Sequence, residues 1–278
     1  MNSHAPASVD LAIALSIAGS DSGGGAGIQA DLKTFHSFGV FGTTVVTAVT
    51  AQNTMGVSAV HPVPTPVVLA QLKAIASDLS PAAFKTGMLA TRELVELVAR
   101  SIDEFSLPAY VLDPVMVATS GDRLLDEDAV AAVRDLLVPR ARIVTPNLPE
   151  AEILTDRPVR DLASMRRAAQ TLVERGAHAA LMKGGHLAGD EMVDLYWDGA
   201  RELVWRRPRI RTRNTHGTGC TLSAGIAAGL ARGASLPQAV EAALDFVARA
   251  IASAPELGSG NGPLNHLVEP SLQLQDDG

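Results

Sequence analysis

Short apolar runs alternate with longer segments of helical spacing along the chain. The run 43–49 is dense in Thr and Val, which is typical of a strand buried on both faces of a sheet. Two further runs flank Asp198-Gly199, a dipeptide that is typical of a hairpin turn. We therefore expect strands at 11–18, 43–49, 110–115, 142–145, 179–182, 193–197 and 202–205, a short strand ending at Lys85, and helices at 28–38, 67–79, 92–102, 126–138, 149–154, 162–174, 218–231 and 236–252.

The alternation of strands and helices predicts an α/β fold in which helices cover both faces of a mostly parallel sheet. This is a three-layer α/β/α arrangement, with the hairpin as a small β excursion. No shift in composition marks a linker between domains. We expect one domain over residues 11–268, preceded by a disordered tail, 1–10, and followed by a frayed tail, 269–278.

Composition and charge narrow the possible functions. The chain has 278 residues, of which 47% are apolar and 19% charged, so disorder is excluded for the chain as a whole. The net charge of −7 and the absence of a basic stripe make nucleic acid and anionic membranes poor partners. The single cysteine, Cys220, cannot form an intrachain disulfide, and the first residues do not form a signal peptide. We expect a cytoplasmic protein.

Polar and glycine-rich clusters follow the predicted strands. In a parallel sheet, ligands bind outside the carboxyl ends of the strands. Each cluster alone indicates only a loop, but their convergence at one edge predicts a binding site. The clusters are 19–27, 51–53, 85–87, 113–114, Asn147 and 183–185.

The sharpest pattern is segment 214–221, Asn-Thr-His-Gly-Thr-Gly-Cys-Thr, which opens a helix of small residues. Its glycines let backbone N–H groups converge where the helix dipole favours a phosphate. The alternative is a glycine-rich turn that only caps a buried helix. Cys220 lies in the first turn, where the pKa of a thiol is lowered, so it is a candidate general base toward a hydroxyl group beside the phosphate.

Two further segments have both a structural and a chemical interpretation. Lys183 ends a predicted strand, where it is either a surface side chain packed along its stem or a phosphate partner; the neighbouring anion site favours the second. Asn147 and Glu150 match a helix cap with Pro149 in the first turn. Their alternative role is to hold Mg²⁺ or its waters near a nucleotide.

Segment 25–30 matches the Gly-x-Gly-x-x-Ala pattern of dinucleotide-binding proteins. That pattern requires an acidic residue about 20 positions further on, for the ribose. The chain has Thr-Ala-Gln-Asn at 50–53 instead. We therefore interpret the loop as one that lets the backbone approach a ligand.

Taken together, these segments resemble the ribokinase-like superfamily, and within it the hydroxymethylpyrimidine/phosphomethylpyrimidine kinases of thiamine biosynthesis. The resemblance runs from about residue 11 to residue 266. Cys220 stands where most ribokinase-like sugar kinases carry aspartate after Gly-Thr-Gly, a departure that the pyrimidine kinases share. The matching motifs are 18–21, 24–31, 47–48, 51–54, 85–89, 112–116, 120–122, 145–150, 181–186 and 216–223.

The resemblance implies a homodimeric enzyme that uses ATP and Mg²⁺ to phosphorylate the pyrimidine hydroxymethyl group and then the resulting phosphate. It implies that Gln52 binds the aminopyrimidine, because a carboxamide offers both a donor and an acceptor. The other implied residues are Gly19, Asp31, Met88, Val115 and Cys220 in the substrate pocket, Thr215, Gly217, Thr218, Gly219, Lys183 and Asn147 at the nucleotide, and Asn147, Glu150 and Asp113 at Mg²⁺.

A mechanism follows from these roles. Lys183, Mg²⁺ and the backbone amides of 217–219 stabilise charge on the transferring phosphoryl group. Cys220 removes the proton of the hydroxymethyl group in the first transfer. In the second transfer the nucleophile is already a phosphate oxygen, so Cys220 matters less.

Three other functions compete with this one. A pyridoxal-type kinase shares the 85–87 motif and Cys220, and substrate competition distinguishes it. The interpretation as a nicotinamide oxidoreductase is supported only by segment 25–30, and the missing acidic residue argues against it. A non-catalytic small-molecule sensor would keep the pocket without turnover, and the intact set of Lys183, Asn147, Glu150 and 217–220 argues against that.

Overall fold

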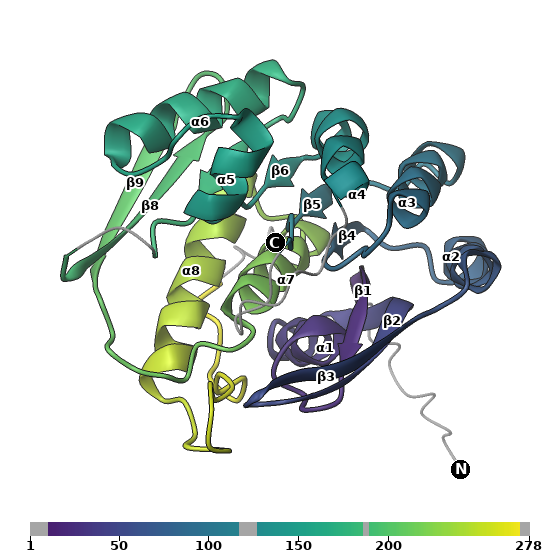
Figure 1. Ribbon diagram of the computed structural model, residues 1–278, viewed down its shortest axis with the longest axis horizontal. Helices are drawn as coiled ribbons and strands as arrows, with labels where there is room; N and C mark the ends of the chain where they lie inside the picture. The colour runs from purple at the N-terminus through teal and green to yellow at the C-terminus, as the bar shows by residue number, and fades with distance from the viewer. Residues whose placement is uncertain (1–10, 117–126, 186–188, 273–278) are drawn as a thin grey trace, which may run out of the picture.

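The computed structural model describes residues 11–116, 127–185 and 189–272 (Figure 1). Several expectations fall outside these ranges: the tail 1–10, the end of the second tail (273–278), residue 126 of a predicted helix, the motif 120–122, and His186.

Within the described residues, nine strands form one sheet in the order β3-β2-β1-β4-β5-β6-β7-β8-β9. The six strands from β2 to β7 in this order are parallel. β3 adds an antiparallel edge on one side, and the hairpin β8–β9 adds one on the other. The strands are β1 (Ile13–Asp21), β2 (Phe41–Asn53), β3 (Gly56–Pro62), β4 (Ala83–Thr86), β5 (Tyr110–Leu112), β6 (Ile143–Val144), β7 (Ala180–Met182), β8 (Glu191–Trp197) and β9 (Glu202–Pro208).

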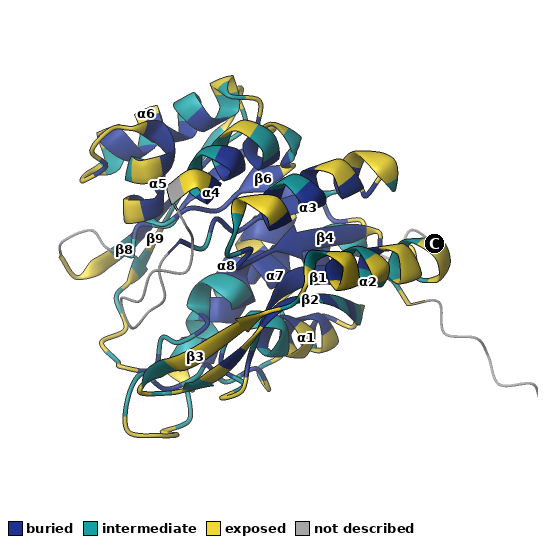
Figure 2. Cartoon of the chain, turned by 45° about the vertical axis from the view of Figure 1, so that its right-hand side comes forward, coloured by how far each residue is buried: buried dark blue, intermediate teal, exposed yellow. Residues whose placement is uncertain are grey.

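Helices cover both faces of the sheet, so the predicted three-layer α/β/α fold is confirmed (Figure 1). One buried cluster joins the strands to α2 through α6, and a second joins them to α1, α7 and α8. Figure 2 shows the central strands and α7 mostly buried, whereas the edge strand β3 and the outer faces of α2 and α3 are exposed. The helices are α1 (Gly27–Ser37), α2 (Thr65–Asp78), α3 (Arg92–Glu104), α4 (Glu127–Ala132), α5 (Leu148–Thr155), α6 (Leu162–Glu174), α7 (Thr218–Ala231) and α8 (Leu236–Ala252).

Small residues let α7 lie close to its neighbours. A Cβ on Gly229 would lie 2.8 Å from Ala239 Cβ, and one on Gly225 would lie 2.9 Å from Ala243 Cβ, both on α8. Because the two helices pack this tightly, the first turn of α7 has a fixed position over the carboxyl ends of the strands.

The sequence predicted α6, α7 and α8 to the residue, whereas the bounds of several other elements, such as β1, β2 and β5, differ by a few residues. Two elements differ in kind. β3 is missing from the expectation, because its residues are mostly exposed and carry no buried alternation. The helix expected at 126–138 ends as an α-helix at Ala132 and continues as a π-helical turn, Val133–Leu137, and a 3₁₀ turn, Val138–Arg140. Pro139 has no backbone N–H, so the α-helical ladder of hydrogen bonds cannot continue through it.

No helix in the described part of the chain is both long and apolar enough to cross a membrane.

Candidate active site

A cavity of about 780 Å³ lies at the carboxyl ends of the parallel strands. Each polar cluster singled out in the sequence contributes residues to its lining, from the end of β1 to the loop after β7. The sheet topology thus brings segments that are 30 to 195 residues apart in sequence to one site. The predicted site residues that line it are Gly19, Gln52, Met88, Asp113, Val115, Asn147, Glu150, Lys183, Thr215, Gly217, Thr218, Gly219 and Cys220.

The turn before α7 has the geometry of an anion site. Gly217 is the N-cap residue with a φ of 84°, in the left-handed region that favours glycine. Thr218 donates a hydrogen bond of 2.7 Å from its hydroxyl to the Thr215 carbonyl, which closes the turn. A Cβ on Gly217 would lie 1.9 Å from the Gly25 carbonyl oxygen, so the turn rests directly on the β1–α1 loop. The Thr218 N–H also donates to the Thr215 carbonyl, at 3.2 Å, so it is the other N–H groups of the turn that are left for a phosphate.

The C-terminal segment supports this turn from behind. His216 N–H donates to the Gly262 carbonyl at 3.1 Å, and His216 forms a parallel bridge with Pro263. The Thr221 hydroxyl lies 2.9 Å from His266 Nε2 in the buried interior. Burial lowers the pKa of His266 to about 4, so its ring is neutral at pH 7.

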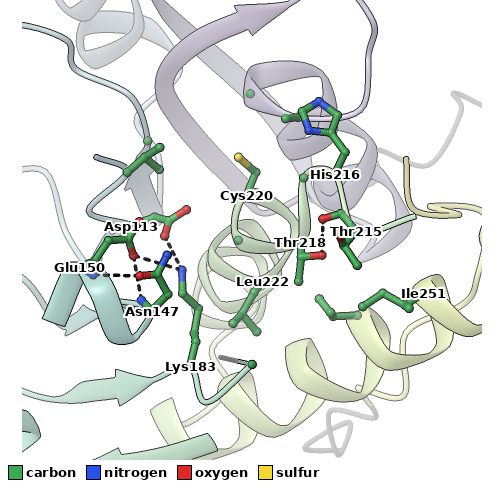
Figure 3. A pocket seen from close by; sticks show the side chains of 18 of the residues that line it. Asp113, Asn147, Glu150, Lys183, Thr215, His216, Thr218, Cys220, Leu222 and Ile251 are labelled. Atoms are coloured by element: carbon green, nitrogen blue, oxygen red, sulfur yellow. Dashed lines mark hydrogen bonds and ion pairs between the residues drawn. The ribbon is translucent and has the colours of Figure 1, made fainter. Parts of the chain in front are cut away.

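Lys183 lies between two carboxylates on the other side of the cavity (Figure 3). Its Nζ is 3.0 Å from Asp113 Oδ1 and 3.8 Å from Glu150 Oε2. Burial opposes the charge on Lys183, but the two carboxylates outweigh it and raise its pKa. A Cβ on Gly219 would lie 3.3 Å from Lys183 Nζ, so the ammonium group is adjacent to the anion turn.

Asn147 and Glu150 form the capping box that the sequence indicated. Asn147 Oδ1 accepts from Glu150 N–H at 2.9 Å, and Glu150 Oε2 accepts from Asn147 N–H at 2.8 Å. Burial raises the pKa of Glu150 to about 7, with Lys183 opposing the shift. The cap thus holds a carboxylate in the cavity that changes charge near neutral pH.

The same cavity is lined by the residues expected to bind a substrate ring. Gln52, near the end of β2, lies with Gly19, Met88 and Val115 on the lining. A Cβ on Gly19 would lie 2.7 Å from Met88 Cε, so glycine makes room for the methionine side chain. The Thr47 hydroxyl donates to the Met88 carbonyl at 2.7 Å and fixes its backbone.

Known proteins share this arrangement. The family described as phosphomethylpyrimidine kinase matches residues 21–265. The chain belongs to this family. A hydroxymethylpyrimidine/phosphomethylpyrimidine kinase of Rhizobium meliloti is 55% identical over 258 residues, which cover 92% of this chain and 97% of the relative. The relative of the same name from Escherichia coli is 45% identical over 91% of this chain and 96% of its own length.

Solved structures agree with the family and the fold. A phosphomethylpyrimidine kinase from Clostridium difficile superimposes with a TM-score of 0.78 at 38% identity, covering 86% of this chain and 99% of that one. A Bacillus subtilis pyridoxal kinase in complex with ADP superimposes with a TM-score of 0.87 at 39% identity, covering 92% and 98%. This member of the phosphomethylpyrimidine kinase family is therefore a phosphotransferase with a ribokinase-like fold.

The structure corrects the expected state of Cys220. Burial raises the pKa of its thiol to about 11, although Lys85 and a hydrogen bond from Gly27 N–H oppose the shift. Asp31 and Asp113 add to it. Burial and these carboxylates outweigh the helix dipole, so the expectation of a lowered pKa is wrong.

The structure also corrects the placement of Asp31. This residue is absent from the cavity lining and completely buried on α1, beneath the floor. Its Oδ2 accepts from the Ser16 hydroxyl at 2.5 Å and from Lys85 Nζ at 3.0 Å, while Oδ1 has no hydrogen-bond partner. Asp31 therefore pairs with Lys85 and does not line the cavity.

Two lining residues, Asp21 and His216, received no role from the sequence. His216 Nε2 lies 2.9 Å from Asp21 Oδ2 across 195 positions of sequence. Both residues stood inside recognised motifs, but no local pattern connects side chains so far apart. Gly25 also makes room for the His216 ring, which the dinucleotide pattern did not indicate. A Cβ at this position would lie 2.5 Å from His216 Cδ2.

Proposed function

We propose that this chain transfers the γ-phosphoryl group of ATP to the hydroxymethyl group of 4-amino-5-hydroxymethyl-2-methylpyrimidine, and then to the resulting monophosphate, in thiamine biosynthesis. The observation that carries the proposal is that one cavity is lined by Gln52, by Lys183 and by the 217–220 turn. The names of relatives at 55% and 48% identity support the substrate.

The phosphate end of the cavity supplies positive and dipolar groups. The amides of Gly217, Thr218 and Gly219 lie at the positive end of the α7 dipole. Lys183 adds a full charge, held by Asp113 and Glu150. In phosphoryl transfer, catalysis consists mainly of positioning and of stabilising the charge on the equatorial oxygens, which suits this set.

Asp113 and Glu150 would hold Mg²⁺, with Asn147 acting through the cap that fixes Glu150. In the described chain, no group of three or more His, Cys, Asp or Glu side chains is placed to hold a metal alone. Mg²⁺ fits nevertheless, because it needs only one or two carboxylates when phosphates and waters complete its shell. When bound, it neutralises charge on the phosphates.

In the first transfer, the hydroxymethyl oxygen forms a bond to the γ-phosphorus, the bond to the ADP oxygen breaks, and ADP leaves. We assign Cys220 Sγ as the acceptor of the alcohol proton. With its pKa raised to about 11, the thiol is protonated in the ligand-free protein at pH 7, so this role requires that the thiol lose its proton once substrate and nucleotide are bound. Lys85, which is buried and does not line the cavity, is the cation that favours the thiolate form.

The test is a coupled assay of ADP formation with Mg²⁺, in which the products are identified by mass. The two candidate alcohols, hydroxymethylpyrimidine and pyridoxal, are supplied separately. Two successive gains of one phosphoryl group on the pyrimidine are expected. No gain on the pyrimidine would contradict the proposal.

Phosphorylation of pyridoxal is the second candidate. Solved pyridoxal kinases from Bacillus subtilis and Staphylococcus aureus superimpose with TM-scores of 0.87 and 0.86 at 39% and 34% identity, the second in complex with AMP-PCP and pyridoxal. A single gain on pyridoxal with none on the pyrimidine would favour this activity.

A homodimer in the cytoplasm also remains part of the proposal. The β2–β3 edge exposes Phe41, Val49, Met55 and Val60, apolar side chains that a second copy would cover. Light scattering of the purified chain tests the dimer.

A further inference from the structure

The carboxylate of Asp21 is fully committed at the edge of the cavity. Its Oδ1 accepts from Gly23 N–H at 2.8 Å, and its Oδ2 accepts from Gly25 and Ala26 N–H at 3.0 and 2.8 Å. Burial opposes its charge, but His216 and these amides outweigh burial and lower its pKa. Asp21 is therefore ionised at neutral pH and can only accept hydrogen bonds.

An ionised Asp21 decides where His216 carries its proton. His216 Nε2 lies 2.9 Å from Asp21 Oδ2, so this nitrogen must be the donor. The conclusion holds whether the ring is neutral or charged. Nε2 carries a proton in the neutral Nε2–H tautomer and also in the imidazolium form.

The amide of Gln52 lies against the same nitrogen. Gln52 Nε2 is 3.4 Å from His216 Nε2, which sets one donor against another. Gln52 Oε1 lies 3.2 Å from Thr50 Oγ1, whose single proton also points to the Ser20 carbonyl at 2.9 Å. A half-turn of the amide removes both conflicts. Oε1 then shares with Asp21 the single Nε2 proton of His216, and Nε2 donates to a Thr50 hydroxyl that keeps its proton on Ser20.

We propose that Asp21 and His216 are positioning residues that fix the order of donor and acceptor on the Gln52 amide, and that this order selects amino- over oxo-pyrimidines. The inference rests on the proposed function, because it takes the ring edge bound by Gln52 to be that of a pyrimidine.

The chemistry of the ring edge gives the selection. A 4-aminopyrimidine offers an exocyclic donor beside a ring acceptor, which matches an amide with its oxygen toward the amino group. The 4-oxo analogue offers a carbonyl beside a ring N–H, the reverse order. The 5-hydroxymethyl group fixes the direction of the ring, since it must point to the phosphate, so the ring cannot turn over to compensate. A bidentate amide contact of this kind discriminates by roughly 10- to 100-fold.

The experiment compares kcat/KM for hydroxymethylpyrimidine with kcat/KM for its 4-oxo analogue, in the wild type and in His216→Leu. Leucine fills the space but donates no proton, so the Gln52 amide is free to rotate. We expect the amino-over-oxo ratio to fall about tenfold, while KM for ATP changes less than about twofold. His216→Gln keeps a donor at the same reach and is expected to restore most of the ratio.

His36→Leu is the matched control, since His36 is exposed on α1. If both pyrimidines lose kcat/KM equally in His216→Leu, the pair has only a structural role and the proposal is overturned. If that variant does not fold, His216→Asn, whose side chain is too short to reach both partners, replaces it.

Dissociation constants of the two pyrimidines, measured by calorimetry, separate this inference from the proposed function. A wild type that binds the amino compound selectively without phosphorylating it contradicts the proposed function, and the ratio of dissociation constants then decides the role of His216. A wild type that binds neither compound contradicts both.

Discussion

Lys85 Nζ lies 3.0 Å from Asp31 Oδ2, and neither side chain is accessible to solvent. Removing one member leaves an uncompensated charge in the interior, which costs about 3–5 kcal/mol, whereas removing both leaves none. We expect Lys85→Met and Asp31→Asn each to lower the free energy of unfolding by about that amount. The loss in the double variant is expected to be smaller than the sum of the two single losses by at least about 2 kcal/mol. Urea unfolding measures all three.

The exposed pair Arg92–Glu96 on α3 is the matched control for that cycle. Its removal is expected to cost less than about 1 kcal/mol. Additive losses at Lys85 and Asp31 would contradict the interpretation of the pair as mutually dependent.

The thiol of Cys220 provides a direct test of the charge on the cavity floor. With a pKa of about 11, the rate of alkylation by iodoacetamide in the ligand-free protein is expected to rise steadily between pH 7 and pH 10. Because the chain has one cysteine, a carbamidomethylated cysteine, identified by mass after digestion, reports this site. A plateau below pH 9 would show a thiol more acidic than the structure implies.

Cys220→Ala is expected to affect the two transfers unequally. Loss of a proton acceptor lowers the rate of the first transfer by about 100-fold or more. The second transfer starts from a phosphate oxygen that carries no such proton, so we expect a loss of less than about tenfold there. Single-turnover rates with the alcohol and with its monophosphate measure the two steps separately. Equal losses would assign Cys220 to positioning.

Gly217 and Gly233 form a natural pair for testing the anion turn. Their φ angles are 84° and 83°, but a Cβ on Gly217 would lie 1.9 Å from Gly25 O, while one on Gly233 meets nothing within 4 Å. Both alanine variants incur the strain of a left-handed residue, about 1 kcal/mol. Only Gly217→Ala must displace the turn, so we expect at least a tenfold rise in KM for ATP there and no change in Gly233→Ala. Similar KM values in the two variants would contradict the role of the turn.

Glu150 gives the protein a pH-dependent stability near neutrality. Burial raises its pKa from 4.5 to about 7, so the folded protein holds a proton that the unfolded chain has released. The stabilisation is complete below pH 4.5 and is lost as the pH rises to about 7. Its size is about 3 kcal/mol, because each unit of pKa difference between the folded and unfolded states corresponds to about 1.4 kcal/mol. Glu150→Gln is expected to remove this slope in urea unfolding.

Mg²⁺ extends the same experiment. It is expected to raise the melting temperature of the wild type at pH 7.5, where Glu150 is charged, and to have little effect on Glu150→Gln. An equal shift in both would place the metal elsewhere.

The sequence predicted the parts of this protein that local chemistry determines. α6 and α8 begin at capping boxes, on Asp161 and Ser235, and α7 begins after Gly217. Their bounds follow from short-range hydrogen bonds that residue types reveal. β3 has no such signal, because an exposed edge strand is defined by its pairing with β2.

The same division holds for the site. Lys183, Gln52 and the 217–220 turn follow strands or open a helix, where composition already indicates ligand binding. The state of Cys220 depends on Lys85 and Asp31, which approach it only through packing. The pairing of Asp21 with His216 likewise arises from two loops that the sheet brings together.

The bracing of the anion turn by the 262–266 segment has a consequence for how the enzyme is made. Gly262 and His266 contact His216 and Thr221, so the brace is absent until residue 266 has been synthesised. A growing chain on the ribosome can form β1 to β7 and still lack a supported phosphate site. Ligands of this site therefore stabilise the braced protein and do little for precursors that still lack residues 262–266.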